Sequence, residues 1–188
     1  HGPYCRGIDA PATSRRPAHR PSRRTDIVDG AMGMFATIPV DEVTVLDIAT
    51  AVDMTPAAVY YHFASKEQIL LEGMTRFRDA MLSEIRSDMP EAGNAAGVGE
   101  LLTRTITWTN RHRTTATVYF VGSIGLNLLV EALRRETRHE LVELLRQAVV
   151  AARGRLPSAE AGVIAVALVS LLETSLASMP NQDGTFRS

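Results

Sequence analysis

The stretch VTVLDIATAVDMTPAAVYYHFASKEQIL, residues 43–70, decides the fold of this chain. Its first part predicts a short helix, because Thr44 is a good N-cap and Asp47 supplies the acidic half of a capping box. Apolar residues then recur at helical spacing as far as Val52. Asp53 interrupts this run, and aspartate tolerates the left-handed backbone conformation that a tight turn often needs.

A second short helix follows the turn directly. Thr55 is its expected N-cap, and Pro56 lies at the first helical position, where the missing N–H of proline costs nothing. Ser65, with Gln68 three residues later, opens a third and longer helix. Two short helices joined by a tight turn predict a helix-turn-helix, whose second helix enters the major groove of DNA.

The same stretch resembles the DNA-binding signature of the tetracycline-repressor (TetR/AcrR) family of bacterial regulators. The resemblance runs from the first helix to the start of the fourth, and the matching features occur in the family's order: Ile48–Ala49, Thr55, the block Val59 to Phe63, Ser65–Lys66–Glu67 and Leu70. Three departures concern the loops. Asp53 stands where the family usually has Gly, Val52 where it usually has Ala, and the linker 38–42 lacks the family's usual Gly.

The composition favours a soluble helical protein. The 188 residues allow one large or two small domains with a proper core, and Ala, Leu and Val dominate. Cys5 is the only cysteine, which excludes an intrachain disulfide and argues against a cysteine-based metal site. No unbroken apolar run reaches the roughly 18 residues needed to span a bilayer; the nearest covers 161–172. The N-terminus lacks the apolar segment of a signal peptide. We therefore expect a cytoplasmic protein that does not associate with membranes.

Charge is distributed unevenly along the chain. The net charge is −1, but six arginines and one aspartate give residues 1–24 about +5, and the remainder is about −6. We interpret residues 1–24 as a disordered basic arm that contacts DNA phosphates or the minor groove, with Arg23 and Arg24 best placed. The alternative is an N-terminus without a role in binding.

The periodicity of the remaining sequence predicts an all-α fold of about nine helices. The first helix is expected at 25–36, the fourth at 66–88, and the later ones at 100–112, from 114 to a division at Gly122 and Gly125, at 126–133, at 136–153 and, capped by Ser158, at 158–179. This pattern divides the chain into an arm (1–24), a three-helix helix-turn-helix domain (25–66), a C-terminal helical bundle for ligand binding and dimerisation (67–179) and a tail (180–188).

We expect the motif's second helix to contact base edges through hydroxyl and methyl groups, and its surroundings to contact phosphates. The candidate DNA-binding residues are Thr44, His62, Lys66, Arg23 and Arg24 for phosphates, and Thr55, Pro56, Ala57, Ala58, Tyr60 and Tyr61 for the recognition helix. For each of these candidate residues, the alternative is a role as a helix cap or in the protein core.

The resemblance implies an effector pocket among helices four to eight. Acidic and basic residues are sparse between 105 and 130, which favours a hydrophobic effector. The alternative for each lining residue is simple core packing. The candidate pocket residues are Met74, Phe77, Trp108, Arg111, His112, Tyr119, Phe120 and Asn127.

The last helix is apolar most of the way round, so it must be covered on more than one face. In the family that this chain resembles, the last two helices form a four-helix bundle with those of a second subunit, which implies a homodimer. The alternative is a central helix of a monomeric bundle. The candidate interface residues are Leu141, Leu145, Val149, Val163, Ala167 and Leu171.

These observations predict a ligand-responsive transcriptional regulator, most simply a homodimeric repressor that a small effector releases from palindromic double-stranded DNA. We predict no cofactor, no metal and no catalytic residue, since the sequence has neither a nucleophile elbow nor a phosphate-binding glycine loop. Two alternatives remain open: a DNA-binding adaptor protein without an effector, and a ligand carrier or enzyme built on a helical bundle.

Overall fold

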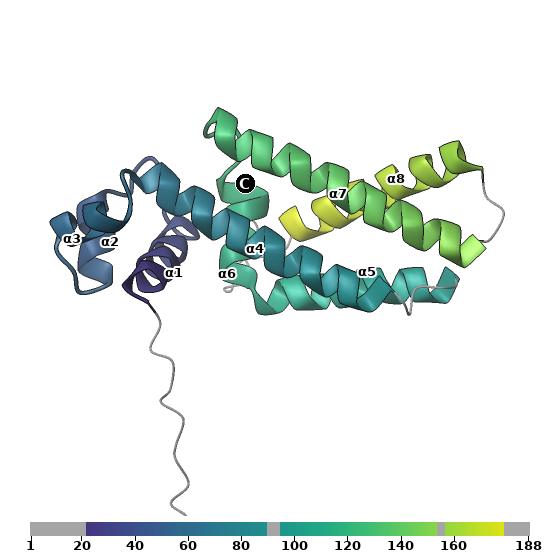
Figure 1. Cartoon of the computed structure of the whole chain (residues 1–188), viewed down its shortest axis with the longest axis horizontal. Helices are drawn as coiled ribbons and strands as arrows, with labels where there is room; N and C mark the ends of the chain where they lie inside the picture. The colour runs from purple at the N-terminus through teal and green to yellow at the C-terminus, as the bar shows by residue number, and fades with distance from the viewer. Residues whose placement is uncertain (1–21, 90–94, 154–156, 179–188) are drawn as a thin grey trace, which may run out of the picture.

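The computed structural model describes residues 22–89, 95–153 and 157–178 (Figure 1). These residues form eight α-helices and one π-helical turn and contain no strand, which confirms the all-α prediction. The elements are α1 (Arg23–Phe35), α2 (Val45–Ala51), α3 (Pro56–His62), α4 (Lys66–Asp88), α5 (Ala95–Arg111), α6 (Arg113–Thr117), the π-helical turn η2 (Val118–Gly122), α7 (Leu128–Arg153) and α8 (Ser158–Ala177).

Helices α1–α3 form a compact head at one end of the molecule (Figure 1). The three predicted caps are present: the side chain of Thr44 accepts from the Asp47 N–H, that of Thr55 from the Ala58 N–H, and that of Ser65 from the Gln68 N–H. Asp53 has a φ of 52°, so the turn between α2 and α3 uses the left-handed conformation that the sequence predicts.

Helix α4 connects the head to the body of the molecule, which consists of α5–α8 (Figure 1). Its buried side packs on α1 in the head and on α5 and α7 in the body. An ion pair between Arg86 and Glu140 adds a polar link between α4 and α7. One continuous helix therefore contacts both the head and the body.

Four predicted boundaries differ from the structure. Helix α1 begins at Arg23, so the predicted arm ends before residues 23 and 24; residues 1–21 lie outside the described residues, as do 179–188. Helix α5 begins five residues earlier than predicted. The segments 126–133 and 136–153 are one helix, α7, because the residues between them include no helix breaker. Ser158 lies inside α8, and the cap residue is Pro157, which provides no side-chain hydrogen bond.

Helix α8 is unusually apolar. It is long enough and apolar enough to cross a membrane, and only 28% of its most apolar window is buried within the chain. A count of consecutive apolar residues misses this property of α8, because the count stops at Glu173 inside the helix. Its polar residues point towards a role in a bundle, since Glu173 and Ser170 both bind Arg138 of α7.

Candidate functional site

The recognition helix α3 presents its tyrosines to solvent. Tyr61 is 86% exposed and Tyr60 is 55% exposed, whereas Val59 on the opposite side is fully buried. Phe63, at the C-cap, is also buried and holds the end of the helix against the core. Exposed aromatic side chains with hydroxyl groups are suited to contact base edges and phosphates. The interpretation of Tyr60 as a core residue is therefore not supported.

The start of α3 exposes small groups beside these tyrosines. Thr55 is exposed, and its Oγ1 accepts a hydrogen bond from the Ala58 N–H at 3.2 Å. Ala57 is exposed, and Pro56 and Ala58 are half-buried. The lone proton of the Thr55 hydroxyl stays free for a DNA acceptor, so capping and DNA contact are compatible for this residue.

Thr44 and Asp47 form a closed capping box at the start of α2. The Thr44 N–H donates to Asp47 Oδ2 at 2.8 Å, and the Thr44 hydroxyl donates to the same atom at 2.6 Å. These hydrogen bonds from Thr44 lower the pKa of the Asp47 carboxyl. The hydroxyl proton of Thr44 is thus already used, which leaves only its exposed oxygen and methyl group for other contacts.

The ammonium group of Lys66 binds backbone carbonyls rather than lying free at the surface. Its Nζ donates to the carbonyl oxygens of Val40 at 2.7 Å, Val43 at 2.9 Å and Asp41 at 3.0 Å. An ammonium has three N–H donors, and all three are occupied here. The predicted phosphate contact would have to break one of these bonds, so the structure gives Lys66 a structural role in the loop before α2.

Arg24 is also engaged within the protein. Its Nη1 donates to the carbonyl oxygen of His62 at 2.6 Å, and its guanidinium forms an ion pair with Glu72 of α4. Arg23, one residue earlier, is exposed and without such a contact. The side chain of His62 is half-buried and lies edge-on to Tyr61. Of the predicted phosphate ligands, Arg23 and His62 remain the ones with side chains not held by strong polar contacts.

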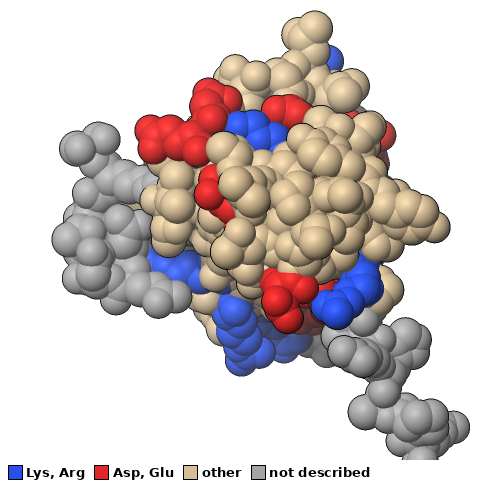
Figure 2. Space-filling view, turned by 90° about the vertical axis from the view of Figure 1, so that its left-hand side faces the viewer, with Lys and Arg blue, Asp and Glu red and all other residues tan. Residues whose placement is uncertain are grey.

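Few positive charges lie in the head. Residues 22–66 contain Arg23, Arg24 and Lys66 against six acidic residues. Figure 2 views the end of the molecule that carries the head and shows a largely uncharged centre with acidic and basic groups towards its edges. Contacts of the recognition helix therefore depend on hydroxyl, methyl and aromatic groups rather than on a basic surface.

The predicted pocket residues divide into two groups. The aromatic ones pack together in the core of the body: the ring centroids of Phe77 and Tyr119 are 5.3 Å apart, and those of Tyr119 and Phe120 are 5.0 Å apart. Trp108 lies 5.7 Å from Phe77, and Met74 is fully buried beside them. Tyr119 and Phe120 belong to η2, and π-helical turns are frequent at functional sites.

The predicted polar anchors lie elsewhere. Arg111 and His112 are exposed, and His112 stacks on Trp108 with its Nδ1 2.9 Å from the Trp108 carbonyl oxygen. Asn127 caps α7, because its Oδ1 accepts from the Val130 N–H at 2.9 Å. Of these three side chains only His112 contacts the aromatic group, through Trp108 and from the surface, whereas Arg111 is exposed and Asn127 satisfies a helix end.

Among the described residues of the body, two buried polar side-chain atoms lack a hydrogen-bond partner, and the sequence identified only one of the two residues. The Tyr119 hydroxyl and Nη2 of Arg113 are inaccessible and make no hydrogen bond of ordinary geometry. Burial raises the pKa of Tyr119 more than the neighbouring Thr137 side chain lowers it, so the Tyr119 hydroxyl remains a neutral donor. Unsatisfied buried donors are rare and suit a polar group of a ligand. Arg113 has no sequence signal that separates it from its exposed neighbour Arg111.

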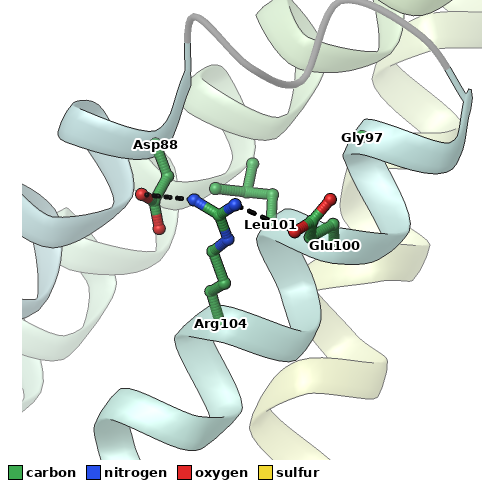
Figure 3. A pocket seen from close by; sticks show the side chains of 5 residues that line it. All are labelled: Asp88, Gly97, Glu100, Leu101 and Arg104. Carbon is green, nitrogen blue, oxygen red and sulfur yellow. Dashed lines mark hydrogen bonds and ion pairs between the residues drawn. The ribbon is translucent and has the colours of Figure 1, made fainter.

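A shallow surface pocket lies at the far end of the body. Asp88, Gly97, Glu100, Leu101 and Arg104 surround a volume of about 10 Å³, which holds one water molecule at most (Figure 3). Arg104 forms ion pairs across it with Asp88 and Glu100. Its polar groups bind one another, and the volume excludes an effector.

The predicted dimer residues also divide into two groups. Leu141, Leu145 and Val149 of α7 are buried within the single chain, so they are not available to a second subunit in this arrangement. Val163 and Leu171 of α8 are exposed large apolar residues. The exposed apolar residues that recur at helical spacing along α8 are Val163, Val166, Ala167 and Leu171. An exposed apolar stripe of this kind marks an interaction surface.

Comparisons with known proteins identify the head and the fold. Residues 27–72 match the sequence model described as bacterial regulatory proteins, tetR family. The transcriptional repressor KstR2 of Mycobacterium tuberculosis is 33% identical over 73 residues, which are 39% of this chain and 36% of that protein. The chain therefore matches about a third of the length of this curated relative.

Two solved structures share the fold over most of the chain. A TetR-family transcriptional regulator from Bordetella parapertussis has a TM-score of 0.69 at 21% identity and covers 86% of this chain and 85% of its own. The regulator AibR, solved with isovaleryl coenzyme A and operator DNA, has a TM-score of 0.70 at 18% identity and covers 88% and 91%. Residues 27–72 are thus similar to the tetR family of bacterial regulatory proteins, and the fold of most of the chain is similar to that of the two solved regulators.

Proposed function

We propose that this protein is a DNA-binding transcriptional repressor that a small molecule releases from its operator. The observation that carries the proposal is the exposed side of α3, where two tyrosines stand beside small polar and methyl groups on a helix-turn-helix held by three N-caps. This arrangement is that of a recognition helix presented to the major groove. The cytoplasm is the compartment in which such a protein meets DNA.

Base contacts come from the recognition helix in this proposal. Thr55, Tyr60 and Tyr61 donate or accept hydrogen bonds, and the exposed methyl of Ala57 meets a thymine methyl. Arg23 and His62 approach phosphates from the two ends of the motif. The four arginines in the sequence before α1, within residues 1–21, add positive charge that compensates for the acidic balance of the head.

We further propose that two copies pair through α8. The stripe Val163, Val166, Ala167 and Leu171 is exposed along this helix, while α7 covers its opposite side. A symmetric pair presents two recognition helices to one side of the duplex, so the operator is palindromic. In this proposal residues 25–66 contact DNA, and residues 67–179 serve for dimerisation and effector binding.

The effector in this proposal is mainly apolar and enters beside the cluster of Phe77, Tyr119 and Phe120. The neutral Tyr119 hydroxyl supplies a hydrogen-bond donor within that apolar region. AibR was solved with isovaleryl coenzyme A, so a first panel consists of apolar carboxylic acids and their coenzyme A thioesters. A ligand of this chain raises its melting temperature and releases bound DNA.

The experiment that tests DNA recognition is a selection from a random duplex library, read by sequencing. The expected result is one enriched palindrome. Tyr61→Ala should then weaken binding to that duplex by about 1–3 kcal/mol, as expected for a base contact. Leu128→Ala, which removes an equally exposed apolar side chain from the body, serves as the control. Enrichment of no sequence by the parental chain, or equal binding by the two variants, contradicts the proposal.

A further inference from the structure

The guanidinium of Arg24, on α1, connects α3 of the head to α4. Its Nη1 donates to the carbonyl oxygen of His62, the last residue of α3, at 2.6 Å. Its Nε donates to Glu72 of α4 at 3.2 Å, and Nη2 donates to the other oxygen of the same carboxylate. Its Cζ lies 4.0 Å from the centre of the buried Phe63 ring. One side chain of α1 thus binds the end of α3 and the first half of α4.

The contact with His62 matters because α3 is short. A seven-residue helix leaves most of its C-terminal carbonyls without a partner inside the helix. A cation at that end satisfies a carbonyl and interacts favourably with the helix dipole. Thr55 fixes the other end, so the direction of α3 depends on a local cap at its start and on Arg24 at its finish. Tyr60 and Tyr61 lie in the turn that Arg24 holds.

The contact with Glu72 extends this control into α4. Glu72 also binds Arg76 one turn later. Burial by itself raises the pKa of Glu72, but the hydrogen bonds from Arg24 and Arg76 outweigh it, and the pKa lies below its usual value. The carboxylate is therefore charged at neutral pH and holds the guanidinium in the orientation in which Nη1 reaches His62.

We propose that Arg24 and Glu72 form a positioning pair, through which the place of α4 sets the orientation of the last turn of α3. The inference rests on the proposed DNA-binding function and adds a route by which α4 affects it. When α4 shifts along or about its axis, Glu72 moves and the guanidinium can no longer satisfy both the carboxylate and the His62 carbonyl. Operator affinity then falls although neither residue contacts DNA.

The guanidinium of Arg24 is too exposed for the pair to act chiefly through stability. Arg24 is 45% exposed and Glu72 is 23% exposed, and ion pairs at such positions contribute little to the free energy of unfolding. The sign of the Glu72→Gln effect separates positioning from simple electrostatics. Removing a negative charge from α4 beside the head strengthens DNA binding if only charge matters, whereas loss of the guanidinium's orientation weakens it.

The test compares the full chain with Arg24→Met, Glu72→Gln, the double variant and Arg76→Met. Arg76 is the matched control, because it binds the same carboxylate but lies on α4 itself, without a hydrogen bond to α3. Binding to the selected palindrome is measured by fluorescence anisotropy, and stability by urea unfolding. We expect Kd to rise about tenfold for each single variant and no further for the double variant, with Arg76→Met within about twofold of the parent. A Glu72→Gln chain that binds as tightly as the parent, or more tightly, overturns the proposal.

Amide hydrogen exchange gives a readout that does not require DNA. The positioning pair predicts faster exchange of the amides of residues 59–63 in Arg24→Met and Glu72→Gln than in Arg76→Met. Equal exchange in all three variants contradicts the pair. If the parental chain selects no duplex sequence while these exchange differences occur, the proposed DNA-binding function fails and the positioning pair stands.

Discussion

Replacing Lys66 with methionine tests which role this residue has. The substitution keeps most of the side chain's apolar length and removes the ammonium. The carbonyl groups of Val40, Asp41 and Val43 then lose their shared donor, and the contacts to Val40 and Val43 are partly buried. The loop before α2 depends on these bonds, because three of its carbonyl groups accept from the same nitrogen atom.

The magnitude follows from the number and kind of hydrogen bonds. A hydrogen bond to a charged group contributes roughly 1.5–3 kcal/mol. The three bonds share one cation and one of them is exposed, so they do not add in full. We therefore expect the free energy of unfolding to fall by about 2–4 kcal/mol. At roughly 2–4 °C per kcal/mol for a chain of this size, the melting temperature falls by roughly 4–16 °C.

The assay is urea unfolding of the parent, Lys66→Met and Arg23→Met. Arg23 is the control, because its loss also removes one positive charge from the head but no buried hydrogen bond. We expect only Lys66→Met to unfold at lower urea, and the salt dependence of operator binding to keep its parental slope in this variant. If Lys66→Met unfolds like the parent and the slope falls by about 0.9, Lys66 contacts a phosphate and the structural reasoning is wrong.

Two further substitutions test packing and assembly. Gly30→Ala places a Cβ 2.4 Å from Cγ1 of Val52. Despite the better helix propensity of alanine, we expect urea unfolding to show a free energy of unfolding lower by about 1–2 kcal/mol. Val52→Ala in the same chain should recover most of this loss, and additive losses contradict the coupling. Leu171→Asp should convert the proposed dimer to monomers in analytical ultracentrifugation, whereas Thr107→Asp, on an exposed position of α5, should not; a dimeric Leu171→Asp chain excludes the α8 interface.

The local features of the head were predictable from the sequence because their causes lie within a few residues. Thr44, Thr55 and Ser65 each cap a helix through an amide three residues later. The turn at Asp53 likewise depends on one residue that tolerates a positive φ. Caps and turns of this kind fix where helices begin and how they connect, which explains why the all-α fold and the helix-turn-helix were predicted correctly.

The roles of the cations were not predictable in the same way. Arg24 reaches a carbonyl 38 residues away and a carboxylate 48 residues away, and Lys66 reaches carbonyls 23 to 26 residues away. A sequence shows that a positive side chain lies beside the motif, but its partner depends on the tertiary structure. A basic residue near a recognition helix is thus an ambiguous sign of DNA contact.

The stripe on α7 illustrates a second ambiguity. Leu141, Leu145 and Val149 recur at helical spacing, which correctly predicts that this face is covered. The periodicity does not distinguish a covering helix of the same chain from one of a second subunit. In the structure the same chain covers α7, and the exposed stripe lies on α8, whose apolar surface exceeds what α7 can cover.

The use of Arg24 and Lys66 within the fold limits how the head attracts DNA. Among residues 22–66, all of which the structure describes, Arg23 is the one lysine or arginine whose side chain makes no hydrogen bond or ion pair that holds the head together. One phosphate contact per subunit corresponds to a slope of about −0.9 in the logarithm of affinity against that of salt. Residues 1–21 contain four further arginines. A steeper slope per subunit therefore reports the contribution of those arginines, while the discrimination between sequences rests on the uncharged side of α3.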